Sequence, residues 1–310
     1  MSGYRHWMLS ALLPALLLAG CGGSGSGIIA DGGTSGTGIS RGSVTALSSI
    51  TLNGNTLETT GAAVRINGQP AQLSELSVGQ VVRVEADFGR GTAQRIELNP
   101  QIVGPVDAVS LADGTGTLTV MGQPVAVQAD TRIADFGDAS AIAVGDRIRV
   151  SGLAAPGGGL VATHISLASS ARERVIATMH SPGSSGAATF GMGGLTVDHS
   201  QAESADFPGG SPSAGDRLLV VGQLRSDGVL RAERVEPHDA LGAEPGDAVR
   251  ITGILEGLVG TDRFAIEQTA LDLEDARIEN GPAEPGDRVR VIGTLDSRGR
   301  IDAATVRVDP

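Results

Sequence analysis

The stretch Val144-Gly145-Asp146-Arg147-Ile148-Arg149-Val150-Ser151-Gly152 decides the fold that we predict for this chain. Its polar and apolar residues alternate, and a period of two is the pattern of a β-strand with one buried face. Ile148 and Val150 are therefore expected in a core, with Arg147 and Arg149 on the opposite face. The Gly-Asp pair predicts a turn, because glycine accepts positive φ and the aspartate can bond nearby backbone. The closing glycine is expected to permit a bulge or a sharp bend.

This unit occurs four times along the chain. The matching stretches begin at Val78, Val144, Ala214 and Pro285, and their turn glycines are 66, 70 and 71 residues apart. The first copy departs most, since it has Gln80 in place of the aspartate and Ala86 in place of the closing glycine. A repeat of this period defines the unit of folding.

The repeat and its turns predict an all-β protein. No segment has the pattern of an amphipathic helix, and turn residues such as Asp227-Gly228 separate short strands. We expect tandem modules, each a small five-stranded β-barrel related to the OB type. A two-sheet sandwich is the competing architecture. The predicted modules are 42–100, 101–168, 171–238 and 239–310, after a Gly/Ser-rich flexible tether at 21–41.

The first twenty residues, 1–20, have the three parts of a secretory signal peptide. A basic start is followed by an apolar stretch and then by small residues. The apolar stretch is too short and too interrupted by proline for a convincing membrane-spanning helix. The sequence Leu18-Ala19-Gly20-Cys21 resembles the bacterial lipobox, in which the signal is cleaved just before a cysteine that carries diacylglycerol.

The lipobox resemblance implies lipidation of Cys21, which would make the membrane a partner of this chain. Because residue 22 is glycine and not aspartate, the resemblance further implies an outer-membrane anchor, and we expect it to face the periplasm. An ordinary signal peptide that contains a cysteine is the alternative. Cys21 is the only cysteine, so its lipidation would leave no thiol nucleophile, disulfide or cysteine metal site.

Composition argues against nucleic-acid binding. The chain has 35 acidic residues against 23 basic ones, all of them arginine, and a net charge of −12. Aromatic residues make up 2% of it. Single-strand grooves need positive potential and exposed aromatic rings, so we expect no nucleic-acid partner. Phe136 and Phe207 follow the same Ala-Asp pair in two copies and are expected in the core.

The repeat also resembles a known family. An opening strand with a small residue, a Val-Gly-Asp turn, a Val-x-Val-x-Gly strand and a terminal Asp-Gly-x-Leu-x-Ala-x-x-Val are similar to a bacterial domain of unknown function. Residues 226–235 match the terminal motif well. The resemblance implies tandem copies in an exported protein or lipoprotein, and it carries over no catalytic or ligand-binding residue.

The four histidines outside the signal peptide are candidate metal ligands. His164 takes a position held by arginine or threonine in other copies, so we expect it on a solvated strand face. His180, His199 and Asp198 belong to the third copy, and His238 follows it. Two histidines and a carboxylate could bind Zn²⁺ or Cu²⁺. Because no closely spaced pair is present, we expect no metal and no cofactor.

The repeated Arg-x-Arg strands allow two interpretations. They could present an arginine ridge to an anionic glycan or lipid headgroup. We favour pairing of these arginines with the surplus Asp and Glu on a solvent-exposed face of the sheet, where each ion pair contributes under about 1 kcal/mol to stability.

No Walker loop or Rossmann fingerprint is present, the Ser/Gly stretches at 22–27 and 183–186 do not fit the Gly-x-Ser-x-Gly elbow, and we expect no enzyme. The leading hypothesis is a non-enzymatic, lipid-anchored cell-envelope protein that acts as a spacer and interaction scaffold, with an envelope protein or glycan as its partner. The alternative is a module that binds a small ligand or envelope glycan on a barrel face or in a groove between barrels.

Overall fold

The computed structural model describes residues 36–182, 188–204, 207, 211–257 and 264–309. The predicted signal peptide and Cys21 lie outside these residues, and so does most of the predicted tether. Strands account for 57% of the structure, which confirms the all-β class. The described helical segments are two three-residue 3-10 turns, Leu73–Glu75 and Ala139–Ala141. No described helix has the length and apolar character needed to cross a membrane.

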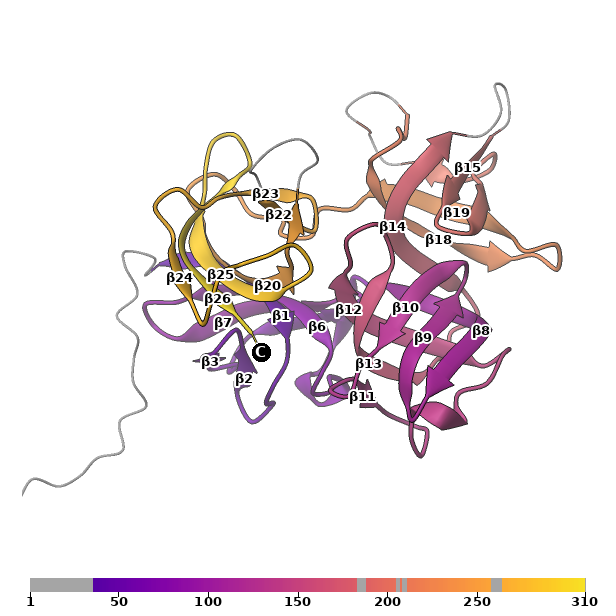
Figure 1. Cartoon of the computed structure of the whole chain (residues 1–310), viewed down its shortest axis with the longest axis horizontal. Coiled ribbons are helices and arrows are strands. Elements are labelled where there is room, and N and C mark those ends of the chain that lie inside the picture. The colour runs from indigo at the N-terminus through magenta and orange to yellow at the C-terminus, as the bar shows by residue number, and fades with distance from the viewer. Residues whose placement is uncertain (1–35, 183–187, 205–206, 208–210, 258–263, 310) are drawn as a thin grey trace, which may run out of the picture. The chain divides into compact units, whose positions relative to one another are not determined.

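The second copy shows the repeated unit clearly (Figure 1, magenta). Its opening strand β8 pairs with β9, β9 forms a hairpin with β10, and β12 forms a hairpin with β13. The last strand, β13, also runs parallel to β10, and β12 returns to pair with β8. The bounds are β8 (Ile102–Ala112), β9 (Thr115–Val120), β10 (Gln123–Val127), β11 (Arg132–Ile133), β12 (Arg147–Ala154) and β13 (Leu160–Leu167).

The other copies repeat this order with small differences. The first contains β1 (Thr37–Ser43), β2 (Ile50–Leu52), β3 (Asn55–Leu57), β4 (Ala63–Ile66), β5 (Gln69–Ala71), β6 (Val81–Asp87) and β7 (Thr92–Leu98). The third contains β14 (Glu173–Pro182), β15 (Thr189–Met192), β16 (Leu195–Asp198), β17 (Glu203–Ser204), β18 (Arg217–Leu224) and β19 (Val229–Pro237). The fourth contains β20 (Ala248–Ile254), β21 (Glu256–Gly257), β22 (Phe264–Ile266), β23 (Thr269–Asp272), β24 (Arg277–Glu279), β25 (Arg288–Leu295) and β26 (Ile301–Val308).

The prediction of discrete five-stranded OB-like barrels is wrong. Strands of different copies pair with one another: β8 lies antiparallel to β14, and β1 lies parallel to β20. The described strands therefore form two twelve-stranded sheets and the separate β2–β3 pair. One hydrophobic core also contains residues of both the second and the third copies. The topology is that of stacked coils in a β-solenoid, and not of separate barrels.

A physical reason explains this error. Sequence alternation indicates which side chains of a strand are buried, but it does not identify the strand's neighbour. An unpaired edge strand exposes a row of backbone N–H and C=O groups that another strand can satisfy. The opening strands β8 and β1 use these groups to pair with later copies, so the sheets continue across the repeat boundaries.

The predicted turns are confirmed in the structure. Gly145 has a φ of 92°, a left-handed conformation that suits glycine. The Asp146 carboxylate accepts a hydrogen bond of 2.8 Å from the backbone N–H of Ala143, and Asp216 and Asp287 repeat this arrangement. In the first copy Gln80 replaces the aspartate, yet its side-chain oxygen accepts an equivalent bond of 2.9 Å from a backbone N–H.

The predicted bulge at the closing glycine is also confirmed. In the second, third and fourth copies the pairing register shifts at Gly152, Gly222 and Gly293, and in the first copy at Ala86. A Cβ atom on Gly222 would lie 2.1 Å from the carbonyl oxygen of Arg231. The glycine therefore allows the close backbone approach that the bulge requires.

The predicted core residues are buried. Ile148 and Val150 are fully buried, as expected from alternation. Phe207 is buried and Phe136 packs against the same core, which confirms their assignment as core residues. The tether prediction, however, extends too far, because residues 37–41 form most of β1 and are held there by pairing with β6 and β20.

Candidate functional site

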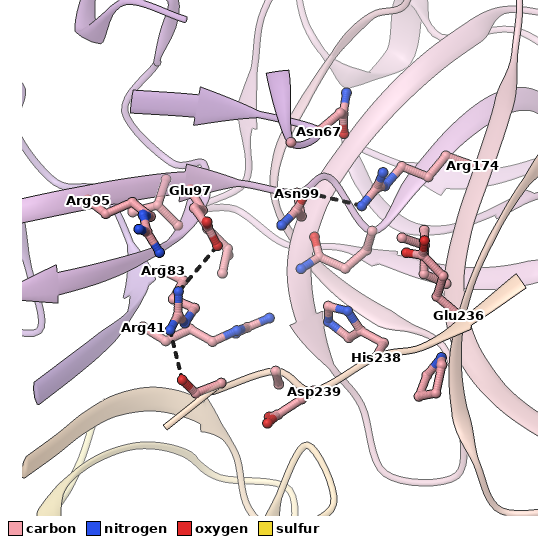
Figure 2. Close-up of a pocket in the computed structure, with 18 of the residues that line it drawn as sticks. Arg41, Asn67, Arg83, Arg95, Glu97, Asn99, Arg174, Glu236, His238 and Asp239 are labelled. Atoms are coloured by element: carbon pink, nitrogen blue, oxygen red, sulfur yellow. Dashed lines mark hydrogen bonds and ion pairs between the residues drawn. The ribbon is translucent and has the colours of Figure 1, made fainter. Parts of the chain in front are cut away.

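A polar cavity of about 440 Å³ is the candidate functional site (Figure 2). Its walls come from β1, β6 and β7 of the first copy, from β14 and β19 of the third, and from the connector after β19. Among the described residues, five arginines line it: Arg41, Arg83, Arg95, Arg174 and Arg234. Four carboxylates also line it, those of Glu85, Glu97, Glu236 and Asp239, together with His238.

Alternation on β6 places part of this wall. Val82 and Val84 point into the core of the first copy, so Arg83 and Glu85 lie on the opposite face of the strand. Across the sheet, Arg83 lies 3.2 Å from Glu97, and Glu85 lies 3.1 Å from Arg95. This is the cross-strand pairing that we expect for strand arginines. It stabilises the wall of the cavity, and it leaves little of the charge of these arginines available to a ligand.

Arg174 differs from the arginines on that wall. It is buried, and its Nε and Nη2 groups donate hydrogen bonds of 3.1 Å to the Pro100 carbonyl and the Asn99 side-chain oxygen. Among the described residues no carboxylate lies within ion-pair distance of it. Burial, and then the charge of Arg234, lower its pKa to about 10, so Arg174 stays positively charged near neutral pH.

His238 lies on the same cavity, in the connector after β19. Its backbone N–H donates to the Arg217 carbonyl at 2.8 Å. Burial, followed by the positive charges of Arg217, Arg41 and Arg174, lowers its pKa to about 3. The imidazole is therefore neutral across the physiological range and does not add charge to the cavity.

Arg41 connects the cavity to a buried ionic cluster. Its Nη2 lies 2.9 Å from the carboxylate of Glu267, which belongs to the turn between β22 and β23. This contact is an ion pair that lacks hydrogen-bond geometry, so neither Glu267 oxygen forms a hydrogen bond within the described chain. Arg41 Nη1 and two nitrogens of Arg217 also have no hydrogen-bond partner there. The Glu267 backbone has a φ of 48°, a conformation that costs free energy outside glycine.

A second cavity, of about 630 Å³, lies on the Arg217 side of this cluster. Apolar side chains such as Ile102 and Ile176 line it, together with several glycines, Gln268 and His180. Glu256 also faces it, and burial raises the pKa of that carboxyl group. The Gln268 side chain donates a hydrogen bond of 2.9 Å to the Gly215 carbonyl, so the tip of the β22–β23 hairpin contacts the third copy.

The histidines considered as metal ligands are not brought together. His180 lies on the second cavity, whereas the His199 ring lies 5.3 Å from the Phe190 ring. Asp198 accepts a hydrogen bond of 3.0 Å from the Ser200 backbone. Within the described part of the chain, no group of three His, Cys, Asp or Glu side chains gathers as a metal site would require.

The prediction that His164 lies on a solvated face is wrong. This residue is only 3% exposed, and burial lowers the pKa of its imidazole. His164 lies on β13 between two paired neighbours, opposite Arg132 of β11 and Ser151 of β12. Equivalent positions of the repeat can thus differ in solvent exposure, because different segments pack against them in different copies.

Several arginines of the Arg-x-Arg strands pair with carboxylates, whereas the Nε of Arg149 is buried without a hydrogen-bond partner among the described residues. Arg147 pairs with Glu173, Arg288 with Asp130, and Arg290 with Asp309. Sequence reasoning did not identify the cavity arginines, since Arg41 was assigned to the tether and Arg174 was not singled out. One available signal was the charged pair Glu173-Arg174 at the start of an otherwise apolar strand.

The predicted lipidation motif, Leu18, Ala19, Gly20 and Cys21, lies outside the described residues. The fold and the repeated turn-and-strand unit define the class of protein, an all-β chain of tandem repeats. The chain belongs to the family described as domain of unknown function (DUF5666), whose profile matches residues 41–97, 103–166 and 186–236. This confirms the expected tandem copies of a domain of unknown function.

Comparison with other known proteins adds little to the family assignment. No curated protein matches the chain. A solved Drosophila structure titled "drosophila Unr CSD456" matches 68% of this chain and 97% of its own, at 16% sequence identity and a TM-score of 0.17. A similarity of this strength carries no argument about fold or function.

Proposed function

We propose that this chain is a non-enzymatic, lipid-anchored protein of the bacterial cell envelope that acts as a spacer and interaction scaffold. The observation that carries this proposal is the strand pairing between copies, β8 with β14 and β1 with β20. Backbone pairing joins the second copy to the third and the first copy to the fourth, which favours a rigid spacer over a flexible string of modules.

The anchor in this proposal is Cys21, at the end of the lipobox-like sequence. Lipid modification would attach at least two acyl chains, and each buried CH₂ group contributes about 0.8 kcal/mol to membrane binding. Two or more chains therefore make a stable anchor. By the same resemblance, Gly22 favours the outer membrane, with the repeats on the periplasmic side.

In-cell crosslinking of the wild type beside Cys21→Ala tests this proposal. We expect the wild type in the outer-membrane fraction with one reproducible crosslinked partner, and the variant depleted from that fraction. A Gly22→Asp variant is the matched control, because it keeps the lipid but should move to the inner membrane. Equal membrane association of wild type and Cys21→Ala, or repeated recovery of no partner, would contradict the proposal.

The cavity of Figure 2 favours a second candidate function, that of a module that binds a small ligand or envelope glycan between copies. Its volume lies within the range of about 300–1,000 Å³ that is usual for small-molecule sites. Ligand-induced thermal stabilisation tests this candidate, since a ligand at 100 times its Kd stabilises the folded state by about 2.7 kcal/mol. No stabilisation by any small envelope sugar or sugar derivative would count against it.

A further inference from the structure

The charge lining the Figure 2 cavity differs in sign from that of the whole chain. The chain carries a net charge of −12, whereas the described residues that line the cavity include five arginines and four carboxylates. His238 is neutral there and does not alter this balance. The cavity is therefore a local region of positive charge on an acidic protein.

Most of these arginines are already paired. Arg83 is bound by Glu97, Glu85 and two backbone carbonyls, and Arg95 is bound by Glu85. Arg234 lies 3.4 Å from Glu236. Hydrogen bonds to uncharged groups hold Arg174, and no carboxylate of the described residues forms an ion pair with it. Arg41 is paired with Glu267, so Arg174 is the lining arginine that has no carboxylate partner among the described residues.

Arg41 supplies a second, independent observation. The residue is 4% exposed, and only its Nη2 faces the Glu267 carboxylate. Its Nη1 is buried without a hydrogen-bond partner among the described residues. A buried donor without an acceptor destabilises the fold, and a charged one does so more strongly, so such a group calls for an acceptor.

These two arginines and His238 line the same hollow (Figure 2). A neutral imidazole can donate one hydrogen bond, and a guanidinium can bind two oxygens of one oxyanion. The three groups together provide the donors that a phosphate or carboxylate needs.

We propose that the Figure 2 cavity binds an oxyanion, a phosphate or carboxylate group on a ligand of about monosaccharide size, held by Arg41 and Arg174. This inference rests on the second proposed function and names its ligand class. Arginine recognises both groups through the same planar arrangement of donors, so phosphorylated sugars and sugar acids share the required chemistry.

Calorimetric titration of the full chain in detergent tests this proposal with three probes: inorganic phosphate, glucuronate and glucose. We expect at least one of the two anions to bind with one site per chain, and glucose to bind at least tenfold more weakly. Arg174→Gln should lower anion affinity at least tenfold. The matched control is Arg225→Gln, which removes an arginine that pairs with Asp198 and Asp227 away from the cavity lining.

Arg174→Lys is the second variant, because it retains the charge but loses the planar donors. We expect a smaller loss of affinity than for Arg174→Gln, with thermal unfolding of each variant checking that it is folded. Binding of phosphate alone or of glucuronate alone supports the proposal and identifies the source of the oxyanion. Failure of both anions to bind, or unchanged anion binding in folded Arg174 variants, overturns it. Glucose binding as tight as anion binding overturns the ligand class but leaves the binding function standing.

Discussion

The Glu267 carboxylate lies 2.9 Å from the Arg41 guanidinium, and their side chains are 0% and 5% exposed. Arg41 belongs to β1 of the first copy, whereas Glu267 belongs to the β22–β23 turn of the fourth. Removing one partner of a buried ion pair leaves an uncompensated charge, which typically costs 3–5 kcal/mol. Because Arg41 and Glu267 belong to the first and fourth copies, this ion pair connects segments far apart in the described chain.

Glu267→Gln should lower the free energy of unfolding by about 3 kcal/mol, because Arg41 and Arg217 then lose a buried negative charge. Urea unfolding monitored by circular dichroism measures this change. The control is Arg277→Gln, whose ion pair with Glu279 is largely exposed and should contribute under about 1 kcal/mol. Equal effects of the two substitutions would show that the buried pair has no special role.

Asn53→Ala should also destabilise the fold, by about 2–3 kcal/mol. The Asn53 amide nitrogen lies within 3.0 Å of the Ser40 hydroxyl and of the Arg41 and Arg250 carbonyls, and its oxygen accepts a bond from Thr252. The substitution would leave these buried groups unpaired.

Asn67→Ala is the matched control for Asn53→Ala. Both residues have positive φ, of 53° and 54°, but the Asn67 side chain forms none of these buried contacts. Alanine at positive φ therefore strains the backbone to a similar degree in both variants. The difference between their stabilities, measured by thermal unfolding, then reports the contribution of the buried hydrogen bonds of Asn53. A difference close to zero would be inconsistent with a stabilising role for it.

Gly222→Ala tests the bulge at the closing position of the third copy. The new Cβ would lie 2.1 Å from the Arg231 carbonyl oxygen, so the backbone must shift. We expect a loss of about 1–3 kcal/mol, measured by chemical denaturation. Gly137→Ala is the control, since no atom lies within 4 Å of its new Cβ and no positive φ is required there. A Gly222→Ala protein as stable as the control would contradict the proposed role of the glycine.

Acid should destabilise the protein through His238. Burial and the charges of Arg217, Arg41 and Arg174 lower its folded-state pKa to about 3, against an ordinary value of 6.5. The unfolded state therefore binds the proton more readily, so this contribution to stability is present above pH 6.5 and is lost as the pH falls towards 3.

The His238 contribution can be measured from unfolding free energies between pH 7.5 and 4.5. We expect the wild type to lose up to about 3 kcal/mol through this group over that range, and His238→Gln to lose correspondingly less. Parallel pH profiles for the two proteins would show that His238 does not cause the acid sensitivity.

Local sequence was sufficient to predict the repeated strand and its turns. Alternation placed Ile148 and Val150 in the core, and the Gly-Asp pair predicted a turn that Asp146 closes onto backbone. Local sequence also indicated the bulge at Gly152. These features depend on residues close together in the chain, so their physical causes are local and can be read from one segment.

The tertiary structure decided which strands pair across copies and which charges share a cavity. β1 has no apolar pattern of its own and forms by pairing with β6 and β20, so sequence alone assigned Arg41 to a tether. His164 is buried by neighbours that its own strand does not specify. Edge pairing and the burial of charge depend on contacts between segments far apart in the chain, and the periodicity of a single strand contains no information about its distant partners.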